Sequence, residues 1–397
     1  MDSGSCRSAQ EMWPAISHGV RKEDIMIRSI LLASSALCLV SCGGQAEETR
    51  LYLGADLSYV NEMEDCGAVY RDDGREVDPY ELFAEKGANL VRLRLWHTPD
   101  WTEYSTLADV TEAIRRSQVV GMEVLLDFHY SDDWADPGDQ IIPAAWADIE
   151  SDEELAEAVF VYTRDTLLTL NKQGLMPEMV QVGNETNTEI LLPANVPEDT
   201  GINWERNALL LNAGIRGVRE AGRQAGKTPL IMLHIAQPEN IEPWFEAGMA
   251  AGLENFDLIG MSYYAKWSSK NMEEMGETIS RLRHKYGKGV IVVETSYPWT
   301  LEGQDEAGNI LGEDSLIHAY PATLEGQKQY LLDLTQTVIS NDGQGVVYWE
   351  PAWVTNSCST RWGTGSHWEN AAFFDYDGMN AHSGFDFFSA DYRYPEE

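Results

Sequence analysis

The chain has 397 residues, of which 43% are hydrophobic and 10% aromatic, enough to bury a large core in one big domain or two smaller ones. Its 65 acidic residues outnumber 28 basic ones, and the formal net charge of −37 would repel a nucleic-acid backbone. Acidic polymers are disfavoured more weakly, and a neutral substrate is the easiest fit. Solubility alone is an equally good explanation of the charge.

The N-terminal segment is typical of an export signal. A basic start at residues 26–28 (MIR) precedes an apolar run, 30–40, that is too short to span a membrane as a helix. The run ends in LVSC, which resembles the lipobox of bacterial lipoproteins, where the cysteine is acylated. We therefore expect residues 1–41 to be an extension and lipoprotein signal peptide, with Met26 as the true start, and residues 42–50 a tether. The exported protein would be held at the cell envelope only by a lipid on Cys42.

Short apolar segments alternate with amphipathic ones after the tether. The strand candidates are residues 51–56, 90–96, 123–129, 179–183, 230–235, 256–262, 290–294 and 345–349. The helix candidates are residues 80–86, 107–120, 153–170, 206–225, 272–286 and 324–340. This alternation predicts right-handed βαβ units and a parallel sheet. Eight strands favour a single α/β domain over residues 51–397, a (β/α)8 TIM barrel, with a doubly wound sheet as the alternative.

Two of the predicted strands end in glutamate. Glu185 follows VQVGN, and Glu294 follows VIVV. Because a barrel gathers the carboxyl ends of its strands on one face, the two carboxyl groups are expected to lie across one site. One, kept protonated, would serve as acid, and the other, ionised, would attack an anomeric carbon. A single glutamate at a strand end would more simply be a loop ion pair or helix cap.

Longer motifs cover nearly the whole mature chain in order: GADLS (54–58), VRLRLW (91–96), LLDFHYSDDWADPG (125–138), VQVGNE (180–185), GMSYY (260–264), VVETSYP (292–298) and YWEPAW (348–353). With them the chain resembles glycoside hydrolase family 53, the endo-β-1,4-galactanases. The resemblance implies that Glu185 is the acid/base and Glu294 the nucleophile. It implies retaining cleavage of internal β-1,4-galactosidic bonds in galactan and type I arabinogalactan, the side chains of pectin. We expect the protein to be a monomer and to need no cofactor for catalysis.

Other matched residues receive expected roles. Asn184 would bind the sugar 2-hydroxyl, a contact that strengthens in the transition state. Arg94 would hold the nucleophile ionised, whereas Arg92, on the same strand face, would be purely structural. His129 and Tyr263 would bind sugar or orient the carboxylates, with packing in the core as the alternative. The remaining substrate-binding candidates are Asp56, Asp132, Trp134, Asp136, Trp349 and Trp353, the tryptophans because aromatic faces suit sugar rings.

The chain departs from the family pattern after the acid/base. Many members carry Gly and then Trp before a proline, where this chain has Glu189 and Leu192 before Pro193. A stacking platform is thereby lost, which puts the distal subsites and the product lengths in doubt.

Bacterial members often bind calcium after the seventh strand. Here Glu302, Asp305 and Asn309 are possible ligands of a structural calcium ion, with a solvated acidic loop as the alternative. Cys66 and Cys358, the cysteines left after processing and acylation, follow the first and last strands. These strands are neighbours in a closed barrel, so a disulfide is expected, with two free thiols as the alternative.

Two rival functions stay open. One is another retaining β-1,4-glycanase, such as a mannanase or xylanase. The other is a non-catalytic glycan-binding lipoprotein at the surface, against which the presence of both glutamates counts.

Overall fold

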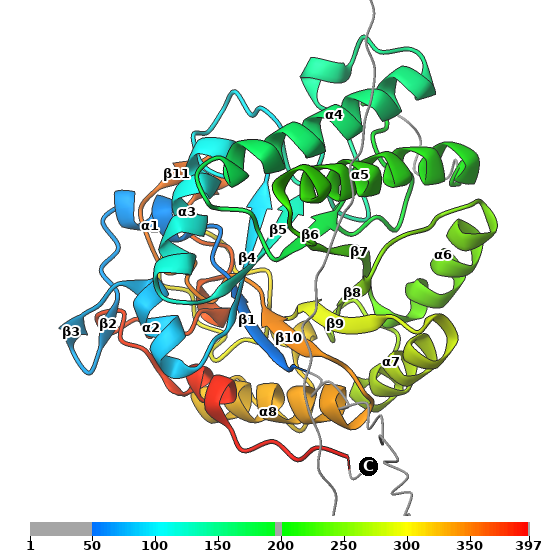
Figure 1. The fold of residues 1–397 in the computed structure, drawn as a ribbon. Coiled ribbons are helices and arrows are strands. Elements are labelled where there is room, and N and C mark those ends of the chain that lie inside the picture. Colours follow the sequence, from blue (N-terminus) through cyan, green and yellow to red (C-terminus); the bar gives the residue numbers. More distant parts are fainter. Residues whose placement is uncertain (1–49, 195–200, 396–397) are drawn as a thin grey trace, which may run out of the picture. The chain divides into compact units, whose positions relative to one another are not determined.

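The computed structural model describes residues 50–194 and 201–395, in which eight parallel strands form a closed barrel (Figure 1). The strands are hydrogen-bonded in the order β1-β10-β9-β8-β7-β6-β5-β4. Their bounds are β1 Tyr52–Asp56, β4 Leu90–Leu95, β5 Glu123–Phe128, β6 Met179–Val182, β7 Leu230–Ala236, β8 Leu258–Ser262, β9 Gly289–Glu294 and β10 Gly345–Tyr348. The predicted (β/α)8 barrel is confirmed, and each predicted strand overlaps an observed one.

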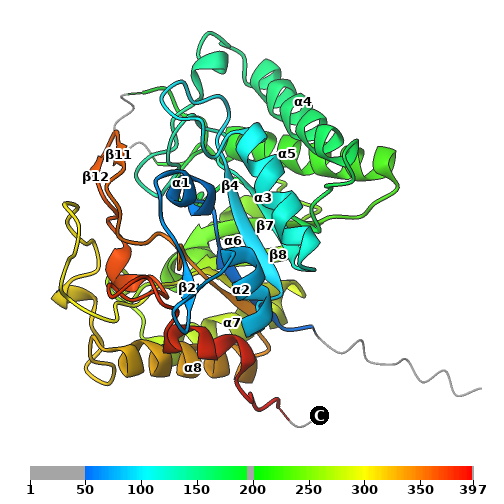
Figure 2. The same ribbon diagram turned by 90° about the vertical axis from the view of Figure 1, so that its left-hand side faces the viewer.

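Helices surround the barrel on its outside (Figure 1). Their bounds are α1 Val60–Asp65, α2 Pro79–Lys86, α3 Leu107–Val119, α4 Asp152–Asn171, α5 Trp204–Ala225, α6 Pro238–Ala250, α7 Met272–Tyr286 and α8 Leu324–Ser340. The short strands β2 (Arg71–Asp72) and β3 (Arg75–Glu76) pair with each other, as do β11 (Ser359–Thr360) and β12 (Gly363–Thr364). The 3-10 helix η5 (Ser383–Ser389) packs against α8 and α2 (Figure 2).

The helices that the sequence predicts share a starting signal. Each begins where a side chain accepts a hydrogen bond from the backbone of the first turn, which stabilises a helix N-terminus. The capping residues are Asp78, Thr106, Ser151, Asn203, Asn271 and Thr323. The two helices that were not predicted, α1 and α6, start without such a cap, and α6 also carries Pro243 in its interior.

The inside of the barrel has an apolar layer and a polar layer. Side chains pointing inward from the strands form a small apolar cluster of Leu90, Leu125, Met179, Met232, Leu258, Ile291, Val293 and Val347. Because side chains alternate along a strand, the next inward positions toward the carboxyl ends are two residues further on. On four strands the residues there are polar and buried, namely Arg92, Asp127, Gln181 and His234, and on β8 the buried Ser262 lies one inward position further along. An apolar layer of side chains therefore lies beneath the polar site.

A disulfide joins Cys66, which follows α1, to Cys358, which precedes β11, with 5.8 Å between the Cα atoms. It links the loop after the first barrel strand to the loop after the last. Cys42, Met26, the predicted signal peptide and nearly all of the tether lie outside the described residues. Among the helices that the structure does describe, none is both long and apolar enough to cross a bilayer.

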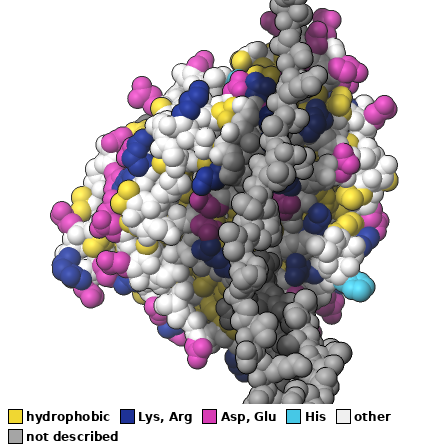
Figure 3. Space-filling view, in the orientation of Figure 1, with side chains coloured by type: hydrophobic (Ala, Val, Ile, Leu, Met, Phe, Trp, Pro, Cys, Tyr) yellow, Lys and Arg dark blue, Asp and Glu magenta, His cyan; other side chains and the backbone are white. Residues whose placement is uncertain are grey.

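Acidic and basic side chains are mixed on the visible part of one face of the molecule. On the face shown in Figure 3, Asp and Glu side chains are spread among Lys and Arg side chains rather than gathered in one patch.

Candidate active site

A cleft of about 820 Å³ lies at the carboxyl ends of the barrel strands. It brings together most of the residues singled out from the sequence: Asp56, Arg94, His129, Trp134, Asp136, Asn184, Glu185, Glu294, Trp349 and Trp353. Two candidates, Asp132 and Tyr263, are not among its lining residues.

A left-handed turn places Glu185 at the mouth. Strand β6 ends at Val182, and Gly183 follows with φ +82°; a Cβ atom there would lie 2.6 Å from the Thr186 side chain, so only glycine fits. Glu185 itself has φ +41°, an uncommon conformation for a residue with a side chain. The turn ends the strand alternation and lets Asn184 and Glu185 both line the cleft.

A register shift places Glu294 on the opposite side. Met261 of β8 pairs with Val292 of β9, but the next residue, Ser262, pairs with Glu294. Val293 already points into the barrel, so regular alternation would turn Glu294 outward. The irregularity re-aims the carboxyl group into the cleft, a known use of β-bulges. Glu294 is only 6% exposed.

The two carboxyl groups are close enough to act on one sugar. One oxygen of Glu185, one oxygen of Glu294 and a ring nitrogen of His234 all lie within 4.8 Å of one another. Carboxyl pairs of retaining glycosidases are ~5–5.5 Å apart, whereas inverting enzymes need ~6.5–9.5 Å to admit a water molecule. The spacing therefore favours direct attack by one carboxylate.

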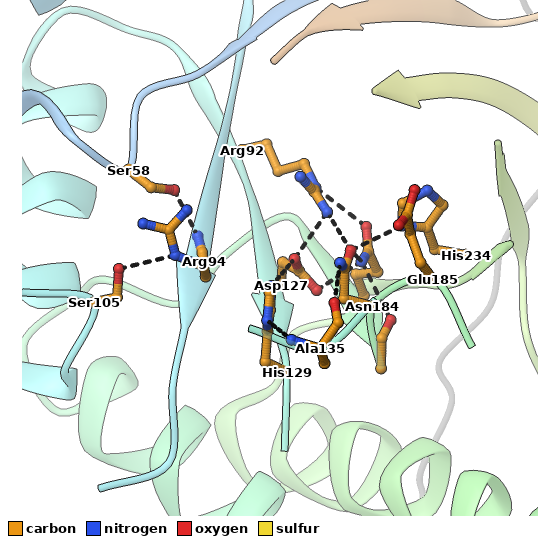
Figure 4. Close-up of polar contacts among 12 residues, drawn as sticks. Ser58, Arg92, Arg94, Ser105, Asp127, His129, Ala135, Asn184, Glu185 and His234 are labelled. Carbon is orange, nitrogen blue, oxygen red and sulfur yellow. Dashed lines mark hydrogen bonds and ion pairs between the residues drawn. The ribbon is translucent and has the colours of Figure 1, made fainter. Parts of the chain in front are cut away.

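Arg92 holds the carboxylate of Glu294, which corrects the expectation that Arg92 is purely structural. Its Nη2 lies 2.8 Å from Glu294 Oε1 and 2.8 Å from Asp127 Oδ2, and its Nη1 lies 2.9 Å from Asp56 Oδ2. The same Nη2 donates to Asn184 Oδ1 at 2.6 Å (Figure 4). One buried guanidinium thus contacts three buried carboxyl groups, and its removal would leave buried negative charge without a partner.

The expectation that Arg94 holds the nucleophile is wrong. Its guanidinium pairs with the buried Glu350 at 3.3 Å and donates to the Ser105 hydroxyl at 3.1 Å, away from Glu294 (Figure 4). It also lies 4.1 Å from the ring centre of Trp134. Both arginines point inward from β4, but Arg94 lies one inward position further along, where the aromatic wall and Glu350 capture it. Arg94 lines the cleft, and its guanidinium packs against the Trp134 ring in a cation–π contact.

The surroundings divide the protonation states of the two glutamates. Burial raises the pKa of both, but the Arg92 guanidinium counteracts this at Glu294. At Glu185 the next cause after burial is the charge of Glu294, which raises the pKa further. A single proton shared by the pair therefore resides on Glu185, and Glu294 is the group that ionises.

Asn184 and His129 belong to a buried polar network around Arg92. Asn184 Oδ1 also accepts from Gln181 Nε2 at 3.0 Å, and its Nδ2 donates to the Ala135 carbonyl at 2.8 Å. His129 accepts from the Ala135 backbone N–H through Nδ1 at 3.1 Å, so its other nitrogen carries the hydrogen that faces Asp127. A second amide hydrogen of Asn184 stays available, and the predicted contact to a sugar hydroxyl remains a prediction.

Two substrate-binding candidates need correction. Tyr263 faces outward into the apolar core, and it is the next residue, Tyr264, that lines the cleft and donates to Glu294 Oε2 at 3.2 Å. The alternation Leu258, Gly260, Ser262, Tyr264 contained this signal. Asp132 accepts from the backbone N–H groups of Thr98 and Ala144, both at 2.8 Å, so its carboxylate braces loops. Loop residues follow no periodicity from which this orientation could have been read.

Tryptophan side chains form much of the cleft wall. Trp134, Trp349 and Trp353 were expected there, and Trp353 is stacked on Tyr59 with ring centres 4.0 Å apart. The sequence reasoning did not select three further tryptophans of the wall, Trp267, Trp362 and Trp368. Trp362 lies on the β11–β12 turn, which follows the disulfide-bonded Cys358 and is not at the end of a barrel strand, so its place in the wall could not be derived from strand ends.

Residues 189–193, where the chain departs from the family pattern, brace a loop and are not among the residues that line the cleft. Arg206 of α5 pairs with Glu189 at 2.8 Å and with Asp152 at 2.8 Å, and it donates to the carbonyls of Ile190 and Leu191. Leu192 exchanges backbone hydrogen bonds with the loop after β5. The segment therefore stabilises the loop that carries Glu185.

Two of the expected calcium ligands accept hydrogen bonds from the backbone. Asp305 Oδ1 accepts from Ala307 N–H, and Oδ2 accepts from the N–H groups of Asn356 and Ser366, so its carboxylate ties loops together. Asn309 Oδ1 accepts from the Asn370 N–H at 3.4 Å. The side-chain oxygens of Asp305 and Asn309 are thus engaged by backbone N–H groups, and binding of calcium, which requires 6–8 oxygens, stays a prediction.

A metal does not fit the catalytic trio. In the part of the chain that the structure describes, Glu185, His234 and Glu294 form the one group of acidic or histidine side chains close enough to share an ion. Both His234 nitrogens are already hydrogen-bonded, to Asn184 and Ser262, and the Arg92 guanidinium touches Glu294. A fixed positive charge at this distance opposes a cation.

Comparison with known proteins agrees with this geometry. Residues 52–388 match the model of glycosyl hydrolase family 53. An arabinogalactan endo-β-1,4-galactanase of Cellvibrio japonicus is 53% identical over 370 residues, covering 91% of this chain and 97% of that protein. The family 53 catalytic domain of Ignisphaera aggregans superposes with a TM-score of 0.79 at 30% identity, covering 88% and 98% of the two chains. One of two fungal β-1,4-galactanases gives 0.73 at 27% identity, covering 85% and 98%.

Proposed function

Because the chain belongs to glycosyl hydrolase family 53, we propose that it is an endo-β-1,4-galactanase that cleaves internal β-1,4-galactosidic bonds of galactan and type I arabinogalactan with retention. The observation that carries the proposal is the carboxyl pair, with oxygens within 4.8 Å, set in a cleft walled by tryptophan. The substrate class is supported by the relative that is 53% identical and carries that name.

Glu185 and Glu294 divide the reaction. The Glu294 carboxylate, held by Arg92 and Tyr264, attacks the anomeric carbon while the proton of Glu185 passes to the departing glycosidic oxygen. Glu185 then takes a proton from water, which hydrolyses the covalent glycosyl-enzyme and regenerates both groups. Asn184, anchored by Arg92, donates its remaining amide hydrogen to the sugar 2-hydroxyl.

Digestion of β-1,4-galactan tests the function. We expect early release of a mixture of oligosaccharides, as internal cleavage requires, and a β-configured first product by NMR. An α-configured first product would contradict retention. Parallel digestion of β-1,4-mannan and β-1,4-xylan distinguishes a galactanase from a mannanase or xylanase. If the wild type binds galactan without cleaving it, the alternative of a non-catalytic glycan-binding lipoprotein is favoured.

Export as an envelope-bound lipoprotein is a second proposal, and it depends on the LVSC segment ending at Cys42. The Cys66–Cys358 bond supports it, because disulfides persist mainly in exported proteins. Expression from Met26 with radiolabelled palmitate should label the wild type and not Cys42→Ser. Equal labelling of both, or of neither, would contradict acylation at Cys42.

A further inference from the structure

Four side chains form a hydrogen-bonded chain that ends on the carboxyl group of Glu185. The Asn184 amide lies 3.0 Å from His234 Nδ1, and His234 Nε2 lies 2.8 Å from Ser262 Oγ. Ser262 Oγ in turn contacts Glu185 Oε1. Figure 4 shows Glu185 and His234 side by side with Asn184 next to them. His234 and Ser262 are fully buried on β7 and β8.

The donor and the acceptor of each hydrogen bond can be assigned in turn, starting from Arg92. A guanidinium only donates, so the Asn184 atom 2.6 Å from it must be the carbonyl oxygen. That oxygen requires a hydrogen on His234 Nδ1. Burial and the nearby Arg92 charge lower the pKa of His234 well below its usual value, so the ring is neutral and carries no second hydrogen.

The count fixes the rest of the chain. His234 Nε2 has a lone pair, and Ser262 must give its one hydroxyl hydrogen to it. Ser262 then faces Glu185 with lone pairs only, and a hydrogen bond forms only if Glu185 is protonated. A serine that donated to an ionised carboxylate would favour the charged form, but here that hydrogen is already committed to His234.

We propose that His234 and Ser262 are positioning residues that keep a proton on Glu185 until the glycosidic oxygen takes it. This inference rests on the proposed glycosidase function. When the C–O bond breaks, its electron pair goes to the leaving oxygen, the Glu185 proton follows, and Glu294 forms the new bond to the anomeric carbon. The Ser262 hydroxyl keeps donating its hydrogen to His234 Nε2 throughout, so the Glu185 carboxylate gains no donor from the serine and readily takes up a proton. Protonation of Glu185 by the incoming water restores the first arrangement.

Other titratable or charged groups also face this hydrogen-bonded chain. They come from β4, from β5 and its following loop, and from the ends of β8 and β9, and they are Arg92, Asp127, His129, Asp136, Tyr264 and Glu294. All of them are unchanged in a variant at Ser262. A shift of the pH profile in that variant is therefore caused by the loss of the serine hydroxyl.

The test is the pH profile of kcat/KM for β-1,4-galactan in the wild type and in Ser262→Ala. Loss of the acceptor destabilises protonated Glu185, so the basic limb should move down by about half to one pH unit. A basic limb that stays in place or moves up would overturn the inference, since upward movement means that Ser262 donates to the carboxylate. Ser117→Ala, which removes a buried hydroxyl of α3, is the matched control and should leave the limb in place.

A second measurement stands even if Ser262→Ala fails to fold. In wild-type protein with 15N-labelled histidine, the His234 signals are identified by their loss in His234→Asn. We expect a neutral ring with the hydrogen on Nδ1; a hydrogen on Nε2, or an imidazolium at neutral pH, refutes the hydrogen-bond count. If the wild type does not cleave galactan, the proposed function fails, while the tautomer still decides the count.

Discussion

The neighbouring tyrosines after β8 give a matched pair for testing the site. Tyr264 donates to Glu294 Oε2 at 3.2 Å, whereas Tyr263 faces the apolar core. Removing one hydroxyl from each leaves the fold nearly unchanged and separates the two roles. Tyr264→Phe is the perturbation, and Tyr263→Phe is its control.

The size of the effect follows from the charge on the acceptor. A hydrogen bond to a charged group contributes about 1.5–3 kcal/mol, and each 1.36 kcal/mol is a tenfold change in rate. We expect kcat/KM of Tyr264→Phe to fall about tenfold to 150-fold, toward the lower end because the contact is long. The lost hydroxyl stabilised ionised Glu294, so the pKa of Glu294 rises and the acidic limb moves to higher pH.

Initial rates of reducing-sugar release from β-1,4-galactan, measured between about pH 4 and 9, check both effects. Thermal unfolding of the variants shows whether the fold is kept. Tyr263→Phe should stay close to the wild type in rate and in limb position. Equal losses in the two variants, or an unchanged acidic limb in Tyr264→Phe, would refute the assignment of Tyr264 to the nucleophile.

Three further outcomes are expected. The kcat/KM profile of the wild type should be bell-shaped, with its acidic limb raised from the usual 4.5 of a glutamate toward about 7, because burial raises the pKa of Glu294; a limb below 4.5 contradicts this. Glu294→Ala should lose hydrolysis and keep galactan binding in affinity electrophoresis, and retained hydrolysis would exclude Glu294 as nucleophile. Non-reducing peptide mapping should find Cys66 joined to Cys358, and Cys66→Ser with Cys358→Ser should lower stability by about 2–5 kcal/mol in denaturant titration.

The sequence is most informative where regular structure and burial coincide. The barrel strands are short apolar runs with polar ends, and the predicted helices all start at capping side chains such as Ser151 and Asn271. Helix α6 escapes detection because Gln237 provides no cap and Pro243 interrupts the pattern. Both carboxylates were found because each closes an apolar strand.

The wrong predictions concern side chains whose inward or outward direction along a strand was overlooked, or whose contacts depend on depth in the barrel. Tyr264, rather than Tyr263, has the inward parity of Ser262, so a stricter use of the two-residue period would have found it. Parity alone cannot separate Arg92 from Arg94, because both face inward and only their depth in the barrel determines which carboxylate each meets. Loop side chains such as Asp132 are set by long-range contacts.

The bond between Cys66 and Cys358 also changes what a protease can do to this molecule. With 292 positions separating its two cysteines, it closes most of the barrel into one covalent ring. A single cut in any surface loop between them opens the ring but releases no fragment, since both new ends remain on the same molecule. The strands on either side of such a nick stay tethered and hydrogen-bonded in the closed sheet. After a single cut, the denatured protein should therefore migrate as one covalent molecule without a reducing agent. It should migrate as two fragments only when the disulfide is reduced.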